Sequence, residues 1–84
     1  MVTVLYFARL RESLGRSREE LTLPENVRSL AAVRDLLVAR GGAWAQELDA
    51  KRPVRAAVNQ EMASGDMPVR DGDEIAFFPP VTGG

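Results

Sequence analysis

The sequence predicts a single small α+β domain in which a mixed sheet packs against one main helix. Strand-like segments occur near both ends of the chain, and an amphipathic helical segment lies between them. A chain of 84 residues buries only about 60–65% of its extended surface, which allows one hydrophobic core but not two. We therefore expect one domain over residues 1–80 and a flexible C-terminal tail over residues 81–84.

The first two strands are predicted from apolar and β-branched residues. Residues 2–8 are apolar in both alternating sets, a pattern typical of a central strand that is covered on both faces. Residues 9–15 are polar and end in glycine, so we expect a loop or a short helical turn there. The alternating segment 20–23, which Pro24 stops, should pair with the first strand as an antiparallel hairpin.

The main helix is predicted to begin after Ser29, because serine favours the helix N-cap. Its apolar residues recur at helical spacing at Leu30, Val33 and Leu37. We expect this stripe to cover one face of the sheet, and the glycine pair at 41–42 to end the helix.

A second short helix is expected over residues 43–48, with Trp44 and Leu48 on one packed face. Three arginines recur at six-residue spacing, which does not keep to one helical face, at Arg28, Arg34 and Arg40. We interpret them as solvated charges.

The last third of the chain predicts three more strands. Residues 54–58 alternate before a turn at 59–60, and a short apolar edge follows around Met62. The Asp-Gly-Asp turn at 71–73 precedes a final strand over 74–78. A hairpin, a helix across the sheet and strands that return beside the first form the ubiquitin-like β-grasp plan, although other small α+β arrangements share this order.

The composition excludes several kinds of active site. The chain contains neither cysteine nor histidine, which removes thiol nucleophiles, imidazole bases and Cys/His metal sites. The acidic residues lack the spacing of a metal-binding loop, so we expect no metal and no bound cofactor, with a carboxylate-only site as the open alternative. A formal net charge of −1 argues against nucleic acid and anionic membranes as partners. With no leader or membrane span in the N-terminal segment, we expect a cytoplasmic protein.

The candidate reactive group is the carboxylate of Gly84. Five residues from Pro80 onward reach about 17 Å at roughly 3.3–3.6 Å each, enough to enter the active site of another protein. The residues of this tail after the diproline are Val81, Thr82, Gly83 and Gly84. Because glycine has no Cβ, the terminal carboxylate is unshielded and open to activation by a partner enzyme. The alternative is that the two glycines are only a frayed end.

The candidate docking surface is the end of the last strand. Strand alternation places Phe77 and Phe78 on opposite faces, and we expect Phe77 to lie inside. Phe78 then becomes the partner-binding anchor, with Met62 as its companion in one apolar patch. The alternative is that Phe78 belongs to the core.

Three segments resemble the small subunits of molybdopterin synthase, and the likeness spans essentially the whole chain. The segments are Phe7-Ala8-Arg9-Leu10-Arg11-Glu12, Ala57-Val58-Asn59-Gln60, and residues 71–84, which close with Phe77-Phe78-Pro79-Pro80-Val81-Thr82-Gly83-Gly84. The closing stretch is the specific part. The resemblance also marks Phe7, Arg11, Pro79 and Pro80 as partner-binding residues, although Phe7 could equally be core and Arg11 part of a solvated loop.

The resemblance implies a sulfur carrier. An ATP-dependent, ubiquitin-activating-like adenylyltransferase would convert Gly84 into a glycyl adenylate, and a sulfur donor protein would then supply the sulfur of a thiocarboxylate, 1-thioglycine. Within the large synthase subunit, this group would donate sulfur to cyclic pyranopterin monophosphate and form the dithiolene of molybdopterin, during molybdenum cofactor biosynthesis. The expected assembly is a heterotetramer of two small and two large subunits, in which this chain is a non-catalytic carrier.

Two other readings stay open. One keeps the fold and the tail but places the carrier in thiamine biosynthesis, in tRNA thiolation or among modifiers that conjugate to lysines. The other is a plain β-grasp interaction module whose terminal glycines have no role.

Overall fold

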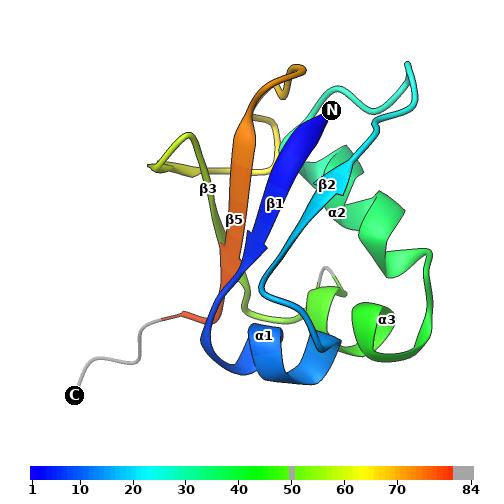
Figure 1. The fold of residues 1–84 in the computed structure, drawn as a ribbon, viewed down its shortest axis with the longest axis vertical. Coiled ribbons are helices and arrows are strands. Elements are labelled where there is room, and N and C mark those ends of the chain that lie inside the picture. The colour runs from blue at the N-terminus through cyan, green and yellow to red at the C-terminus, as the bar shows by residue number, and fades with distance from the viewer. Residues whose placement is uncertain (50, 81–84) are drawn as a thin grey trace.

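The computed structural model describes residues 1–49 and 51–80, which form a five-stranded sheet with three helices (Figure 1). The elements in chain order are β1 (Val2–Tyr6), α1 (Ala8–Leu14), β2 (Arg18–Leu21), α2 (Leu30–Val38), α3 (Gly42–Leu48), β3 (Arg55–Val58), β4 (Glu61–Ala63) and β5 (Glu74–Phe78). The strand order across the sheet is β2-β1-β5-β3-β4. The predicted hairpin, crossing helix and returning strands are all present, so the β-grasp plan is confirmed.

The first and last strands lie side by side at the middle of the sheet. They are parallel, in a register that pairs Thr3 with Glu74 and Tyr6 with Phe77, whereas the other neighbouring strands are antiparallel. The amide of Phe7 donates to the carbonyl oxygen of Phe77 at 3.1 Å, which extends the pairing to the end of both strands. The C-terminal end of β5 therefore lies beside the start of α1.

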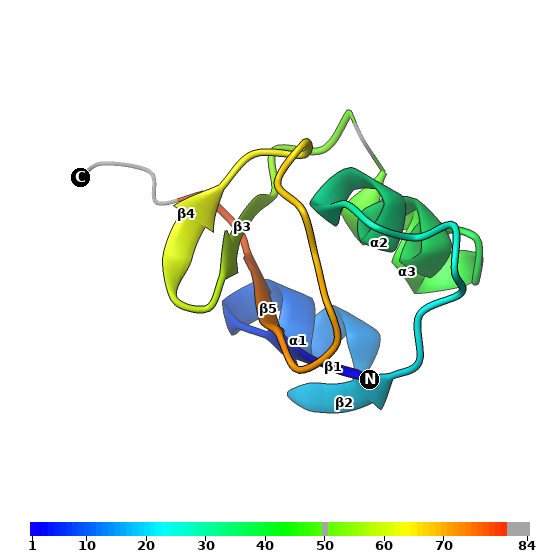
Figure 2. The ribbon, with the colours of Figure 1, turned by 90° about the horizontal axis from the view of Figure 1, so that it is seen from above.

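The core lies between one face of the sheet and the helices α2 and α3, which Figure 2 shows side by side. The inward residues of β1 and β5 are at most 1% exposed, and they are Val2, Val4, Tyr6, Ile75 and Phe77. The opposite face carries no helix, and its residues Thr3 and Leu5 are half-buried. The prediction that this strand is covered on both faces is therefore wrong, because both large helices pack on one side.

The main helix follows the sequence closely. The Ser29 hydroxyl accepts a hydrogen bond from the amide of Ala32 at 3.2 Å, which confirms the predicted N-cap. The apolar stripe that begins at Leu30 is buried, as expected. Helix α2 ends at Val38, before the left-handed Gly41 (φ 77°). Glycine adopts this conformation at little cost, so it suits the turn into α3.

Two arginines interpreted above as solvated charges have structural roles. The Arg34 guanidinium donates to three carbonyl oxygens near the end of α3, those of Leu48 (2.5 Å), Asp49 (2.6 Å) and Arg52 (3.0 Å). These carbonyls have no partner within the helix, so Arg34 satisfies them and fixes α3 to α2. Only Arg28 fits the earlier interpretation, since its side chain bonds to a nearby carbonyl on the exposed surface.

Arg40 belongs to a second network, which joins the two strands of the first hairpin to the turn after α2. Its guanidinium makes two hydrogen bonds to Glu19, at 2.8 and 2.9 Å, and lies 4.4 Å from the ring centroid of Trp44. Glu19 also accepts from the Tyr6 hydroxyl at 2.7 Å. Trp44 packs edge-on against Tyr6, with 5.4 Å between their ring centroids, which confirms a packing role for the tryptophan.

The same network shifts the titration of its members. Burial raises the pKa of Tyr6, and the hydrogen bond to Glu19 raises it further, so the phenol stays a donor at neutral pH. Burial alone would raise the pKa of Glu19, but hydrogen bonds from Arg40 and Tyr6, together with the charges of Arg40 and Arg16, lower it overall. The charged carboxylate is thus the form that the folded protein favours.

This network predicts a pH-dependent effect of Glu19→Gln on stability. Because the folded pKa of Glu19 lies below its unfolded value of about 4.3, its stabilisation is present above that pH and is lost as the pH falls through the folded pKa. We expect the variant to unfold about 1–3 kcal/mol more easily in urea at pH 7, and the difference to shrink in acid. The control is the exposed neighbour Glu20→Gln, and a gap that stays the same in acid would contradict this assignment.

The turn between β3 and β4 contains Asn59 and Gln60, from the central segment that carries part of the family resemblance. Asn59 (φ 51°) and Gln60 (φ 69°) form the left-handed turn between β3 and β4. The Asn59 side chain donates to Asp73 at 3.0 Å and accepts from the amide of Glu74 at 3.0 Å. This turn therefore fastens the β3–β4 hairpin to the start of β5, which is a structural role.

Candidate functional site

The last strand of the sheet leads to the base of the predicted tail. Strand β5 ends at Phe78 at the middle of the sheet, and Pro79 and Pro80 follow as half-buried residues. Proline cannot continue the ladder, because it has no backbone N–H to donate. The predicted tail residues Val81, Thr82, Gly83 and Gly84 lie outside the described residues, so their role stays a prediction.

One row of paired residues crosses the whole helix-free face of the sheet. In spatial order the row is Arg18, Leu5, Ala76, Ala57 and Met62. Ala57 is buried, yet it lies outside the core cluster that packs under the helices, which confirms that the row faces the other side. The middle of this row and its end on β4 are apolar.

Phe78 lies on this same face, two residues beyond Ala76. Phe77 is 1% exposed and stacks on Tyr6, whereas Phe78 is half-buried, so the predicted assignment of the two rings is confirmed. The alternative that Phe78 belongs to the core is wrong, because the helices cover only the Phe77 side. Met62, on the edge strand β4, is 59% exposed.

Phe7 extends the apolar surface at the end of β1. It follows the inward Tyr6 in an extended conformation and is 46% exposed, so it is not a core residue. The parallel register of β1 and β5 continues to place it next to Phe78. We call the surface formed by Phe7, Phe78, Met62, Leu5, Ala57 and Ala76 the apolar patch. The structure thus places Phe7, Phe78 and Met62, the three predicted apolar anchors, on one surface.

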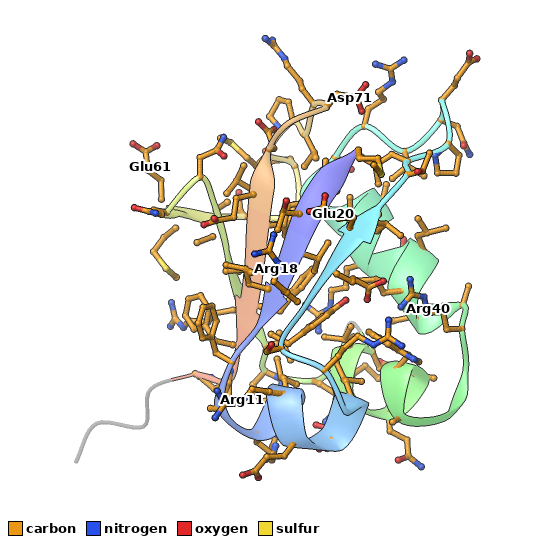
Figure 3. All side chains as sticks on the ribbon, viewed as in Figure 1. Arg11, Arg18, Glu20, Arg40, Glu61 and Asp71 are labelled. Carbon is orange, nitrogen blue, oxygen red and sulfur yellow. The ribbon has the colours of Figure 1, made fainter. Side chains whose placement is uncertain are left out.

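Two arginines flank the apolar patch near the base of the tail. Arg11 is exposed on α1, and Figure 3 shows it at the same end of the sheet as the C-terminal end of β5. Arg55 is exposed on β3 and pairs directly with Phe78. Sequence reasoning did not find Arg55, because only the β3–β5 register reveals that it lies beside the anchor.

Two kinds of group common in active sites are absent from the described residues. The sequence has no cysteine or histidine, and residues 1–49 and 51–80 contain no group of three acidic residues placed to hold a metal ion. A groove of about 300 Å³ lies between α2 and the β3–β4 hairpin, but its lining is mostly apolar, and the guanidinium of Arg34 there is already bonded to carbonyl oxygens. What the site offers is a surface for binding.

Across the same described ranges, no helix combines the length and the apolar character that a membrane crossing requires.

The sequence was compared with protein-family models and with characterised proteins. The model of the ThiS family matches residues 4–84. The molybdopterin synthase sulfur carrier subunit of Escherichia coli (strain K12) is 43% identical over 84 residues, which cover all of both chains.

Two solved structures are similar in fold. The crystal structure of SAMP1 from Haloferax volcanii has a TM-score of 0.79 at 25% identity and covers 99% of this chain and 98% of that one. A chain in the complex of subunits 1 and 2 of molybdopterin-converting factor from Helicobacter pylori has a TM-score of 0.68 at 21% identity, with coverage of 99% and 97%. Together, the family model that spans nearly the whole chain and the full-length relative show that this chain belongs to the ThiS family.

Proposed function

We propose that this chain is the sulfur carrier subunit of molybdopterin synthase, with Gly84 as the group that carries the sulfur. One structural observation carries the proposal. The last strand ends at the centre of the sheet, beside an apolar patch, so a partner that covers this patch also receives the residues that follow Pro80. The full-length similarity to a molybdopterin synthase sulfur carrier favours this pathway over thiamine biosynthesis, tRNA thiolation or an inert interaction module.

The chemistry takes place on the terminal carboxylate. A carboxylate resists substitution until one oxygen becomes a leaving group, and adenylation by an ATP-dependent adenylyltransferase supplies that leaving group. Sulfur from a donor protein then replaces the adenylate and leaves a thiocarboxylate on Gly84. The nucleophilic sulfur adds to cyclic pyranopterin monophosphate and forms a thioester with Gly84. Water then cleaves the acyl–sulfur bond, which leaves the sulfur on the pterin and a carboxylate on Gly84, and the partner supplies the acid–base groups that this chain lacks.

The proposed partner during sulfur transfer is the large subunit of molybdopterin synthase. The complex of subunits 1 and 2 from Helicobacter pylori, which contains a chain of the same fold, supports a pairing of this kind. In our proposal two small and two large subunits form the working heterotetramer. The carrier works in the cytoplasm, where ATP for its activation is available, and returns to the adenylyltransferase after each transfer.

Activation of Gly84 predicts a change in the intact mass of the chain. After incubation with ATP, a sulfur donor and the adenylyltransferase, the mass should rise by the difference between sulfur and oxygen. A variant with three residues added after Gly84 should show no change, because its glycine carboxyl is locked in a peptide bond. An unchanged mass in the native chain, with an adenylyltransferase that is active on another carrier, would contradict the proposed role.

Gly84→Ala separates the chemistry of the tail from the stability of the domain. A methyl group at this position crowds the narrow channel that a terminal glycine can pass. We expect sulfur transfer in the reconstituted synthase to fall by at least about tenfold, or about 1.4 kcal/mol in the barrier, while the urea midpoint stays the same. A normal turnover rate for the variant would be evidence against the terminal glycine as the reactive end.

The apolar patch predicts which side chains hold the large subunit. Phe78→Ala removes a central aromatic anchor and should weaken binding by about 2 kcal/mol, or roughly 30-fold in Kd. Met62→Ala should weaken binding less, because this side chain lies at the β4 edge of the patch. The matched control is Met67→Ala, which removes another exposed methionine outside the patch.

Isothermal titration with the purified large subunit measures these affinities, and urea unfolding shows whether each variant remains folded. If Met67→Ala and Phe78→Ala weakened binding equally, the patch would not be the docking surface.

A further inference from the structure

The charged residues of this chain are divided between the two ends of the sheet. Arg18 and Glu20, an ion pair at 3.4 Å, lie at the boundary between the two regions. Figure 3 shows Arg11 and Arg40 toward the end where β1 and β5 finish, and Glu61 and Asp71 toward the opposite end. We call these the tail end and the far end. A formal net charge of −1 conceals this separation, because the positive and negative regions cancel in the sum.

Unlabelled charged residues follow the same division. Two basic residues, Arg28 and Arg70, line a pocket at the far end together with Glu25 and Asp71. Asp73 and Glu74 also lie there, just before and at the start of β5, and so does Glu61. The tail end is therefore positive and the far end negative, and the axis between them follows the strand that leads to the tail.

Four of the tail-end cations have a carboxylate partner at the same end. Arg9 and Arg52 lie 3.6 and 3.7 Å from Glu47, and Arg16 and Arg40 lie 3.6 and 2.8 Å from Glu19. Within the described part of the chain, Arg11 and Arg55 have no carboxylate within 4.0 Å. Both side chains are exposed, so their charges are available to another molecule.

The positions of Arg11 and Arg55 relate them to the apolar patch. Arg55 pairs with Phe78 across β3 and β5. Arg11 lies on α1, which follows Phe7 directly, at the same end of the sheet as the C-terminal end of β5. The two free guanidinium groups thus lie at the patch, close to its two phenylalanines.

The kind of cation points to carboxylates as the partner groups. The chain has ten arginines and a single lysine, Lys51. A guanidinium presents a planar fork that binds a carboxylate through two parallel hydrogen bonds, which the ammonium group of lysine cannot do. A surface with an apolar centre, flanking arginines and an acidic opposite end suits a protein better than a nucleic acid, whose long phosphate backbone the far end would repel.

We propose that Arg11 and Arg55 dock against an acidic rim around the opening of the large synthase subunit that receives the tail. The charge separation along the sheet orients the chain so that it arrives tail end first. This inference rests on the proposed function, since that function supplies the partner. Steering of this kind raises association rates by about 10- to 1,000-fold, and it weakens as salt shortens the reach of the charges.

The test measures association kinetics with the purified large subunit at about 0.05 M and about 0.5 M salt, between which the Debye length falls from about 14 Å to about 4 Å. Arg55→Glu and Arg11→Glu should each slow association by about 3- to 10-fold at low salt and by less than about twofold at high salt. The matched control is Arg28→Glu, which makes the same charge change at the far end and should alter the rate by less than about twofold. Arg55→Gln, a neutral replacement, should give an intermediate rate, and thermal unfolding checks that each variant folds.

Several results would overturn the proposal. Equal slowing by Arg55→Glu and Arg28→Glu would show that only net charge matters, and rates independent of salt would exclude steering. Unchanged association with the large subunit, together with lost retention on a tRNA column, would assign the arginines to nucleic acid instead. If the native chain failed to bind the large subunit at any salt concentration, the proposed function itself would fail. Binding with no effect of the arginine variants would refute this inference alone.

Discussion

The parallel pairing of β1 with β5 is the contact on which the rest of this structure depends. It joins the first and last strands of the chain at the middle of the sheet, from Thr3 opposite Glu74 to Tyr6 opposite Phe77. A last strand at the sheet's edge could fray without disturbing the core, but β5 is held by ladders on both sides. The sheet therefore holds the last strand as far as Phe78, directly before Pro79.

This pairing also separates the two faces of the sheet by role. The inward side chains of both strands pack under α2 and α3, and the Tyr6–Glu19–Arg40 network and the Arg34 contacts hold the short elements around them. The outward side chains form a surface that no helix covers. Stability and the proposed binding thus use alternate residues of the same strands, so the proposed anchor Phe78 can change without emptying the core position of Phe77.

Predictions from the sequence are most accurate for structural features that depend on neighbouring residues. The Ser29 cap, the apolar stripe of α2 and the Asp71-Gly72-Asp73 turn each depend on neighbours within a few residues, and all three are present. Long-range contacts were missed. Helical spacing could not show that Arg40 reaches Glu19, 21 residues away, or that Arg34 caps α3. Arg55 became a candidate only through its register with Phe78. The partial exposure of the outer face of β1 became evident only from the positions of the helices.

The central claim is that the end of the chain carries the sulfur and that the domain serves to present it. The most direct measurement is a single-turnover reaction of the Gly84 thiocarboxylate form with the large subunit and cyclic pyranopterin monophosphate, in which dithiolene formation and carrier mass are followed together. The account predicts that two carriers return to the carboxylate form for each dithiolene made, because each delivers one sulfur. Dithiolene formation with no loss of sulfur from Gly84, or equal formation from the unmodified carboxylate, would contradict it.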